Sequence, residues 1–248
     1  MEHDSKSHPQ LVLHHAAVAF GDVAVLQDVS LSIWSQQIVA IVGLNGAGKS
    51  TLFRAIGGLV PLIRGRILFE DEEIQMLPVS ERVRRGIIYV PEGMKVFPEM
   101  SVRENLEIGA YLNPGSIPER LANVLDLFPE LTSRLHSRSG ALSGGQQRMV
   151  TLGRGLMSGA RLLLLDDPFL GLSPLIVKRF CDAFRVIRRS GVTLFIAGQH
   201  VRRILNVADL AFLLEDGTIT LSGPGTEVFQ NAHLQQILFG MDPNPPPL

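Results

Sequence analysis

One short segment of the chain has the residue types and spacing of a loop that binds phosphate. Between a β-rich run and a helical run it reads Gly43, Leu44, Asn45, Gly46, Ala47, Gly48, Lys49 and Ser50, followed by Thr51. Glycines let backbone N–H groups turn toward phosphate oxygens, and the N-terminus of the next helix adds a positive dipole end. We expect Lys49 to reach the terminal phosphates and the Ser50 hydroxyl to ligate Mg²⁺. Chance would produce this pattern in roughly one chain in a hundred of this length, so a plain glycine turn is the weaker interpretation.

A pair of aspartates could supply the carboxylates that a phosphate loop needs. Asp166 and Asp167 follow four consecutive leucines, a run typical of a strand buried on both faces. Sheets of this kind bind ligands at the carboxyl ends of their strands. We therefore expect Asp166 to hold the metal ion and Asp167 to face the attacking water. Without the phosphate loop, a helix cap would be the simpler interpretation of two aspartates.

A second glycine pair starts a helix further along the chain. Residues 142–148 read LSGGQQR and include Ser143, Gly144, Gly145 and Gln146. The start of this helix is another anion-binding N-terminus, which one nucleotide on one chain does not need. It has a use if it closes on a nucleotide held by another copy. Ser-Gly-Gly alone would indicate a flexible turn, but the whole string, upstream of the Asp166 strand, favours the binding interpretation.

Alternating strands and helices must position these three segments. The apolar patterns predict strands at 11–19, 29–33, 37–42, 65–69, 87–90, 161–165, 192–197, 210–214 and 218–221. They predict helices at 49–56, 101–111, 118–128, 145–157, 175–189 and 202–207. A capping box of Ser101 and Glu104 opens the second of these helices. The block from about 91 to 159 is mainly helical, so we expect an inserted helical subdomain there.

Length and composition bound the class of protein. With 248 residues, of which 46% are hydrophobic and 19% charged, the chain can bury a sizeable core. Its 23 Lys and Arg nearly balance its 24 Asp and Glu, so no overall field favours nucleic acid as a partner. The single cysteine, Cys181, argues against an internal disulfide or a cysteine metal cluster. No run of about 18 apolar residues occurs without charges, so we expect membranes to matter only through a partner.

Together these motifs resemble the ATP-binding subunits of ABC transporters over nearly the whole chain. The likeness is closest to the branched-chain (hydrophobic) amino acid importers, and it rests on residues 89–93, 96–98, 171–174 and 221–225. The resemblance implies an α/β fold: a P-loop NTPase core, an N-terminal antiparallel β-subdomain and an inserted helical subdomain at about 93–159. The ATPase domain would occupy 11–240, between a loose N-terminus at 1–10 and a Pro-rich tail at 241–248.

The resemblance also implies the cofactors ATP and Mg²⁺ and a set of partners. A second ATPase subunit, a copy or a paralogue, would pair head to tail with this chain. Two transmembrane permease subunits would carry the solute, and a solute-binding protein would take part indirectly. The chain would then lie on the cytoplasmic face of the inner membrane.

Several residues take their expected roles only from the resemblance. Phe20 matches the aromatic side chain that stacks on adenine, although a core phenylalanine at the end of a strand is the alternative. Glu92 matches the loop that senses the γ-phosphate and contributes to the metal site, and residues 168–174 match the loop that crosses the dimer interface. The apolar side chains of 94–100 would either line a docking groove for a permease or pack the helical subdomain; they are Met94, Val96, Phe97 and Met100.

Two positions depart from the usual family pattern. Asp167 stands where a glutamate usually orients the water, and its shorter side chain withdraws the carboxylate by about 1.5 Å, one C–C bond. Misplacement of that order costs roughly 10²-fold in rate. Gln199 stands at the switch position where a histidine is common. A one-residue shift of the alignment gives this role to His200, so both remain candidates.

Three functions agree with these features. The first is an ATP-binding and hydrolysing subunit of an importer for a small solute, a branched-chain or other hydrophobic amino acid. The second is a regulator or ribosome-associated ATPase of the same fold. Such proteins usually carry two ATPase domains and a basic surface, against the one domain and net charge of −1 expected here. The third is a nucleotide-binding, weakly hydrolysing subunit paired with a competent paralogue, which Asp167 keeps open.

Overall fold

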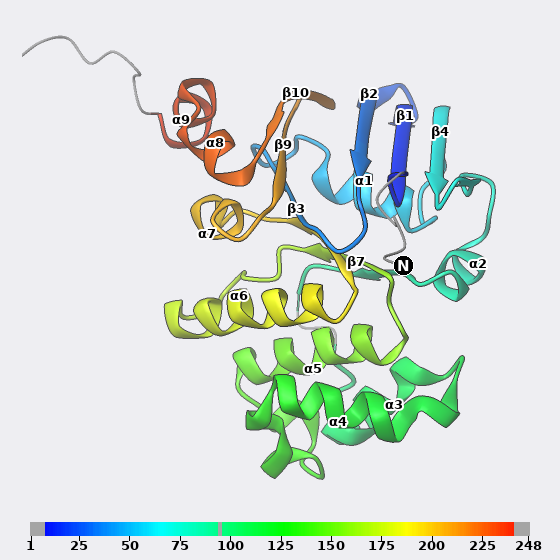
Figure 1. Ribbon diagram of the computed structural model, residues 1–248, viewed down its shortest axis with the longest axis vertical. Coiled ribbons are helices and arrows are strands. Elements are labelled where there is room, and N and C mark those ends of the chain that lie inside the picture. The colour runs from blue at the N-terminus through cyan, green and yellow to red at the C-terminus, as the bar shows by residue number, and fades with distance from the viewer. Residues whose placement is uncertain (1–7, 94–95, 241–248) are drawn as a thin grey trace, which may run out of the picture.

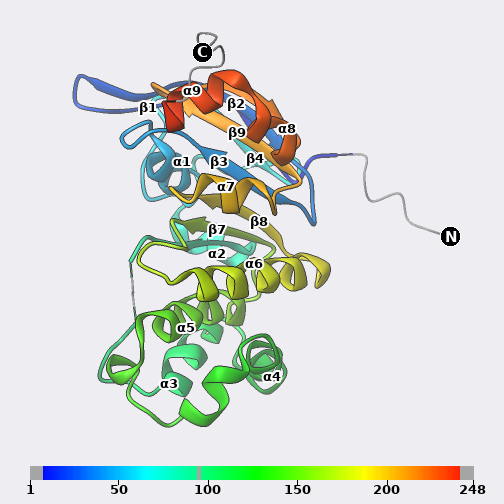
Figure 2. The same cartoon turned by 90° about the vertical axis from the view of Figure 1, so that its left-hand side faces the viewer.

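The strands form one mixed sheet in the computed structural model of the chain, which describes residues 8–93 and 96–240. Its ten strands follow the order β5-β4-β1-β2-β10-β9-β3-β8-β7-β6 (Figures 1 and 2). Alternate residues of β3 divide between two cores: Val39 and Ile41 join the core that contains α1, and Ile38 and Ala40 join the core that contains α5 and α6. Helices therefore cover both faces of the sheet here, and the α/β prediction is confirmed.

The antiparallel part of the sheet comes from the N-terminal third of the chain. Its strands are β1 (Leu11–Phe20), β2 (Val23–Ile33), β4 (Arg64–Phe69) and β5 (Glu72–Glu73). We predicted that the second strand would start at residue 29, but it starts at Val23 because it completes a hairpin in which Phe20 pairs with Val23. Leu26 is the single buried residue of 23–28, so this stretch lacks the alternation that marks a strand.

The parallel part supplies the strands that the site needs. These are β3 (Ile38–Val42), β6 (Ile87–Val90), β7 (Leu162–Asp166), β8 (Thr193–Ala197) and β9 (Leu210–Glu215), with β10 (Thr218–Gly223) antiparallel to β9. Every residue of β3, β7 and β8 is buried, as strands covered on both faces require. Because these strands are parallel, their carboxyl ends lie at the same edge of the sheet.

The helices connect and cover these strands. Their bounds are α1 (Lys49–Ile56), α2 (Val79–Arg84), α3 (Val102–Glu107), α4 (Ile117–Leu127), α5 (Gly144–Met157), α6 (Pro174–Arg189), α7 (Val201–Leu205), α8 (Gly225–Gln230) and α9 (Ala232–Phe239). α3, α4 and α5 gather at one end of the molecule, away from β1, β2 and β4 (Figures 1 and 2). The capping box of Ser101 and Glu104 is present, but α3 is shorter than predicted because the chain tightens into a 3₁₀ turn at Ile108–Ala110. Across the described ranges, no helix is long and apolar enough to cross a membrane.

The predicted loose ends need one correction. Residues 1–7 and 241–248 lie outside the described residues, but Gln10 is firmly held. It is 7% exposed, its N–H donates to Ile33 O at 2.7 Å, and its side chain accepts a hydrogen bond from Thr193 Oγ1 at 2.6 Å. The ordered domain therefore begins before Leu11, because a buried glutamine must satisfy its polar atoms inside the protein.

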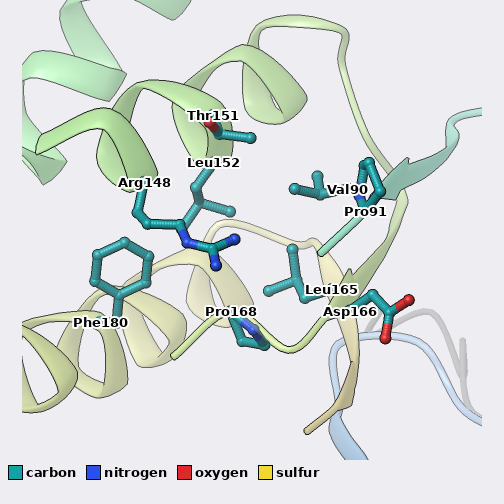
Figure 3. A pocket seen from close by; sticks show the side chains of 9 residues that line it. All are labelled: Val90, Pro91, Arg148, Thr151, Leu152, Leu165, Asp166, Pro168 and Phe180. Carbon is teal, nitrogen blue, oxygen red and sulfur yellow. The ribbon is translucent and has the colours of Figure 1, made fainter. Parts of the chain in front are cut away.

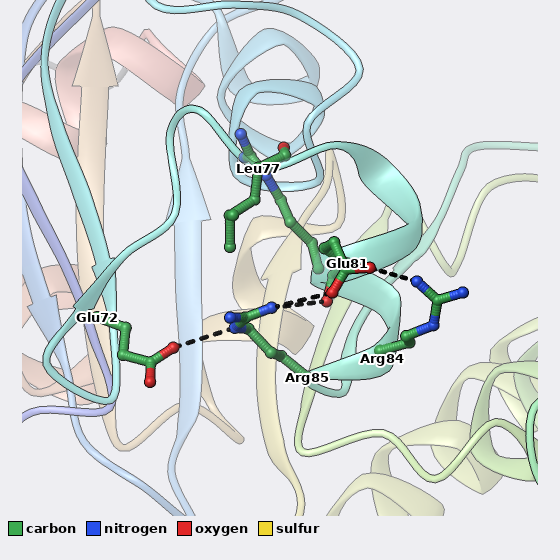
Figure 4. A network of polar contacts seen from close by, with 6 residues as sticks. Glu72, Leu77, Glu81, Arg84 and Arg85 are labelled. Atoms are coloured by element: carbon green, nitrogen blue, oxygen red, sulfur yellow. Dashed lines mark hydrogen bonds and ion pairs between the residues drawn. The ribbon is translucent and has the colours of Figure 1, made fainter.

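The short helix α2 was not predicted, because its one buried side chain is that of an arginine, Arg82. The Arg82 guanidinium donates to Ala55 O at 2.6 Å and to Ile56 O at 2.8 Å, the last carbonyls of α1. Its neighbours Arg84 and Arg85 instead make surface contacts with Glu81, and Arg85 also contacts a glutamate of β5 (Figure 4). Arg82 thus joins α2 by hydrogen bonds to the C-terminal end of α1, the helix that follows the phosphate loop.

Candidate nucleotide site

The phosphate loop leaves β3 and enters α1, as the sequence predicts. Gly43 has φ +156°, and a Cβ there would lie 2.1 Å from the backbone oxygen of Leu214. Gly48 caps α1 with φ +107°, and a Cβ there would lie 2.7 Å from Leu26 Cδ2. The contact at Gly43 is with backbone, and both positions have a positive φ that strains a side chain, so glycine suits this path between the strand and the helix.

A polar pocket of about 320 Å³ opens beside this loop. A single water takes up about 30 Å³ of liquid, so the pocket has room for a chain of phosphate groups. The residues around it are Val25, Asn45, Gly46, Gly48, Lys49, Ser50, Thr51, Glu92, Asp166, Asp167, Gly198 and Gln199. The structure therefore brings the phosphate loop, both aspartates, Glu92 and Gln199 to one place. Val25 and Gly198 are the residues that sequence reasoning missed, because neither residue type has a chemical signature.

Lys49 and Ser50 lie in the first turn of α1. Lys49 Nζ donates to the carbonyl oxygens of Gly43 and Leu44, both at 2.8 Å. Burial lowers the pKa of Lys49, and the charges of Asp166 and Asp167 oppose this shift. The Lys49 ammonium is thus held inside the loop, where phosphate oxygens can replace its carbonyl partners.

Asp166 has hydrogen-bond donors on both carboxylate oxygens. Ser50 Oγ donates to Oδ1 at 3.0 Å, and Tyr89 donates its hydroxyl to Oδ2 at 2.9 Å. Hydroxyl and carboxylate oxygens are the ligands that Mg²⁺ prefers, and Glu92 adds a second carboxylate to the same pocket. The predicted metal ligands Ser50, Asp166 and Glu92 thus form a donor set that fits Mg²⁺.

Asp167 has the opposite environment. It is as buried as Asp166, at 5% exposed each, but its Oδ1 has no hydrogen-bond partner within the described part of the chain. Its backbone is left-handed, with φ +43°. Burial raises the pKa of the Asp167 carboxyl and so do the charges of Glu92 and Asp166, while His200 and the backbone N–H of Gln199 oppose the shift. A buried carboxylate without a full set of partners is costly to ionise.

Gln199 and His200 have different surroundings in the structure. Gln199 is exposed and lines the pocket. His200 caps α7 and packs edge-on against Phe169, with ring centroids 5.9 Å apart, and it is not among the residues lining the pocket. His200 Nδ1 is buried without a hydrogen-bond partner among the described residues. Of the two predicted switch residues, Gln199 is therefore the one that faces the pocket.

Phe20 lies outside the pocket, at the end of β1. Its side chain is 51% exposed, so the alternative that it is a core phenylalanine is wrong. An exposed ring beside the strand that carries Val25 is available to stack on a planar ligand, which leaves the adenine role as a prediction.

The second glycine segment is not brought to the pocket of the same chain. Ser143 and Gly144 are exposed at the start of α5, while Gly145 and Gln146 are half-buried. Ser143 and Gln146 form a capping box, which the sequence analysis did not predict. This helix start therefore points to solvent, as a site that serves another molecule would.

Arg148, further along the same helix, contacts the loops that border the pocket. It is 6% exposed; Nη1 donates to Gly93 O at 2.8 Å, and Nη2 donates to Leu170 O at 3.4 Å. Figure 3 shows the guanidinium reaching from α5 between Phe180 and Leu165. Burial lowers the pKa of Arg148, and the charges of Asp167 and Glu92 oppose this shift. The arginine was visible in the LSGGQQR string, but its buried position was not.

Fold and site together define a nucleotide-binding cassette of the P-loop class. The family described as ABC transporter matches residues 26–170, more than half of the chain. The chain therefore belongs to the ABC transporter family, and it is an ATPase subunit in which ATP hydrolysis is coupled to transport across a membrane.

Several known proteins are similar over most of their length. The high-affinity branched-chain amino acid transport ATP-binding protein BraG of Pseudomonas aeruginosa is 39% identical over 222 residues, covering 89% of this chain and 95% of BraG. The lipopolysaccharide export system ATP-binding protein LptB of Escherichia coli K12 is 33% identical over 236 residues, covering 94% of this chain and 98% of LptB.

Solved structures agree with this assignment. MJ1267, an ATP-binding cassette of an ABC transporter, has a TM-score of 0.86 and 26% identity, covering 94% of this chain and 100% of its own. A dimeric structure of the bacterial ABC transporter cassette MJ0796 has a TM-score of 0.76 at 21% identity, covering 86% of this chain and 98% of its own, and supports the fold.

The incompletely hydrogen-bonded carboxylate of Asp167 predicts a gain in stability when its charge is removed. Asp167→Asn should raise the thermal unfolding midpoint by a few degrees, about 2–4 °C for each kcal/mol recovered. Because folding raises the pKa of Asp167, the stability this group contributes is fully present below the ordinary carboxyl pKa of about 4 and is lost as pH rises through the folded value. The gain from Asn should therefore be largest near neutral pH and disappear in acid, as differential scanning calorimetry across pH can measure.

The matched control is Asp166→Asn, at a neighbouring carboxylate of equal exposure. Both oxygens of Asp166 accept hydrogen bonds, so an amide would turn its NH₂ group toward one of the two donors and should not stabilise the fold. Equal effects of the two substitutions, or a gain that does not depend on pH, would contradict the account of Asp167.

Proposed function

We propose that this chain binds Mg²⁺-ATP in the polar pocket and hydrolyses it as one half of a head-to-tail dimer that drives an importer. The proposed cargo is a branched-chain or other hydrophobic amino acid. The observation that carries this choice is the 39% identity to BraG over 89% of the chain. LptB, named for lipopolysaccharide export, is 33% identical over a similar span, so its cargo is the competing outcome of the test.

Each part of the pocket has a place in this function. The backbone of the loop from Gly43 to Gly48 and the Lys49 ammonium would hold the phosphates. Ser50, Asp166 and Glu92 would hold Mg²⁺, which neutralises charge on the phosphate oxygens when it is bound.

Phe20, outside the pocket, and two residues that line it would act on the base, the water and the terminal phosphate. Phe20 would stack on adenine. Asp167 would orient the attacking water, and Gln199 would donate its amide to the γ-phosphate.

A second subunit would complete the site. The N-terminus of α5 is exposed in one chain and lies apart from that chain's own pocket. Backbone N–H groups at Gly144 and Gly145 suit a phosphate presented by another copy or a paralogue. Closure of the two subunits on ATP and their opening after hydrolysis would supply the movement that drives transport.

The permease partners would dock on an apolar groove between α2, β6 and the helical end of the molecule. Its walls include Leu59, Val79, Val83, Ile88, Val90 and Ile108. Of the loop proposed for docking, Met94 lies outside the described residues, Val96 packs against the core, and Phe97 is 48% exposed beneath the Arg154 guanidinium. Such a surface suits the cytoplasmic end of a permease, which would place this chain on the cytoplasmic face of the inner membrane.

A second candidate function is a nucleotide-binding, weakly hydrolysing subunit paired with a competent paralogue. It is favoured by the environment of Asp167, whose carboxylate is one methylene shorter than glutamate, buried and incompletely hydrogen-bonded. A general base contributes about 10²–10⁴-fold to rate, so its partial loss leaves slow but measurable hydrolysis. In such a pair the site built on this chain's Asp167 would be the slow one.

The cargo can be tested with the complex that this chain forms. Purified with its membrane partners and placed in liposomes, it should drive ATP-dependent uptake of labelled leucine, isoleucine or valine. A complex carrying Lys49→Ala should remain assembled but inactive, because it lacks the cation that faces the phosphates. ATP-dependent extraction of lipopolysaccharide, without uptake of amino acids, would contradict the importer assignment.

The role of the exposed helix start is tested by Ser143→Arg. A bulky cation there should leave ATP binding to the monomer intact and abolish the ATP-dependent dimer, because it occupies the space of the other copy's γ-phosphate. Fluorescence titration with an ATP analogue and light scattering measure the two effects. If Ser143→Arg bound ATP as poorly as Lys49→Ala, the proposed role in a second subunit's site would be wrong.

Asp167→Glu distinguishes the two candidate functions. Because Asp167 lines the pocket, an added methylene can extend into open space and bring the carboxylate closer to the water. We expect steady-state ATPase turnover of the complex to rise, by up to roughly 10²-fold at this site. Asp167→Asn should lower turnover only slightly. Complete loss of turnover in Asp167→Asn would instead make Asp167 a full catalytic base and remove the case for unequal sites.

A further inference from the structure

Tyr89 reaches the carboxylate assigned to the metal ion, although nothing in the phosphate-binding motifs pointed to it. Its hydroxyl donates to Asp166 Oδ2 at 2.9 Å, while Ser50 Oγ donates to Oδ1 at 3.0 Å. Two donors on opposite oxygens fix the plane of a carboxylate, because rotation would break at least one hydrogen bond. The orientation of Asp166 therefore depends on Tyr89 as much as on Ser50.

The sheet explains why this tyrosine reaches that aspartate. β6 pairs in parallel with β7, and Tyr89 lies opposite Leu164. Asp166 lies two residues after Leu164, so its side chain leaves the sheet on the same face as that of Leu164. A phenol at Tyr89 is long enough to span this step along the neighbouring strand, as the observed hydrogen bond shows.

α1 packs on the face of the sheet that carries Tyr89 and holds its ring in place. The buried Phe53 packs edge-on against Tyr89, with ring centroids 6.5 Å apart and planes at 79°. Phe53 and Ser50 are three residues apart and share one side of α1. The helix thus contacts Asp166 directly through Ser50 and indirectly through the Phe53–Tyr89 pair.

The Tyr89 hydroxyl is the donor in this contact, because a carboxylate can only accept a hydrogen bond. Burial raises its pKa to about 12, and Asp166 contributes to this rise while Arg54 opposes it. A protonated phenol donates one hydrogen bond, and the carboxylate can only accept, so the direction of this contact is settled.

We propose that Tyr89 is a positioning residue for the metal ion: its hydroxyl holds Asp166 Oδ2 so that Oδ1 and the Ser50 hydroxyl are presented together to Mg²⁺. This inference rests on the proposed function, because it requires Mg²⁺-ATP at Ser50 and Asp166. Hydrogen bonds that orient a metal ligand typically change metal affinity by about 10–100-fold when they are removed. Loss of the hydroxyl should therefore weaken Mg²⁺ binding and leave the metal-free contacts to phosphate unchanged.

The chain offers a matched pair of substitutions, because it contains two tyrosines, Tyr89 and Tyr111. Tyr111 is 65% exposed, whereas Tyr89 contacts Asp166. Each full-length variant, Tyr89→Phe and Tyr111→Phe, first binds a fluorescent ATP analogue in buffer that a chelator keeps free of metal. Mg²⁺ is then added stepwise, and the fluorescence gives the Mg²⁺ concentration at the midpoint of binding. Tyr89→Phe should bind the analogue as tightly as the unaltered chain when no metal is present. Its Mg²⁺ midpoint should lie at a concentration roughly tenfold higher than that of the unaltered chain, or higher still. Tyr111→Phe should match the unaltered chain.

A folded Tyr89→Phe variant with the unaltered Mg²⁺ midpoint would overturn the inference and leave the proposed function intact. If the unaltered chain itself bound the analogue without any response to Mg²⁺, the proposed function would fail instead. If Tyr89→Phe does not fold, the Tyr111→Phe variant still tests the inference, because Tyr89 is the one tyrosine left in that variant. In this variant the tyrosine bands of the near-ultraviolet difference spectrum come from Tyr89, beside the bands of Trp34. Addition of Mg²⁺ to the nucleotide complex should change the tyrosine bands, and unchanged tyrosine bands would overturn the inference.

Discussion

The register of three parallel strands is the constraint on which the rest of the structure depends. Ala197, the last residue of β8, pairs with Ile41 of β3 on one side and with Asp166 of β7 on the other. Every residue of these strands is buried, so packing on both faces fixes their alignment, and a slip of one residue would turn each side chain to the opposite core. The glycine-rich loop after β3 and the carboxylate of Asp166 therefore meet because the core allows no other pairing.

Two neighbouring carboxylates then differ in chemistry because they differ in partners. Asp166 ends β7 with donors on both oxygens, while Asp167 turns into a left-handed backbone conformation with one oxygen unsatisfied. At equal burial, Asp166 has a hydrogen-bond donor on each carboxylate oxygen, whereas burial raises the pKa of Asp167. A group held in this state is costly for the fold and is found where a function requires it.

Much of this arrangement could be predicted from the sequence, because local rules decide it. The bounds of α1 and β6 and the buried strand before Asp166 agree with the predictions, since glycine stops and leucine runs act over short distances. Helix α9 was missed although Asn231 caps its start and Gly240, with φ +64°, ends it. The contacts of Gln10, Arg82 and Tyr89 could not be predicted, because each joins segments whose proximity only the folded sheet creates.

One helix connects the pocket to the surface that would serve a second subunit. The first turn of α5 exposes Ser143, and the next turn buries Arg148. Arg148 holds the carbonyls of Gly93 and Leu170, which lie on the loops after β6 and β7. Those loops carry Glu92 and Asp167 to the pocket. A molecule that binds the exposed end of α5 therefore contacts an element whose buried Arg148 guanidinium is hydrogen-bonded to both loops.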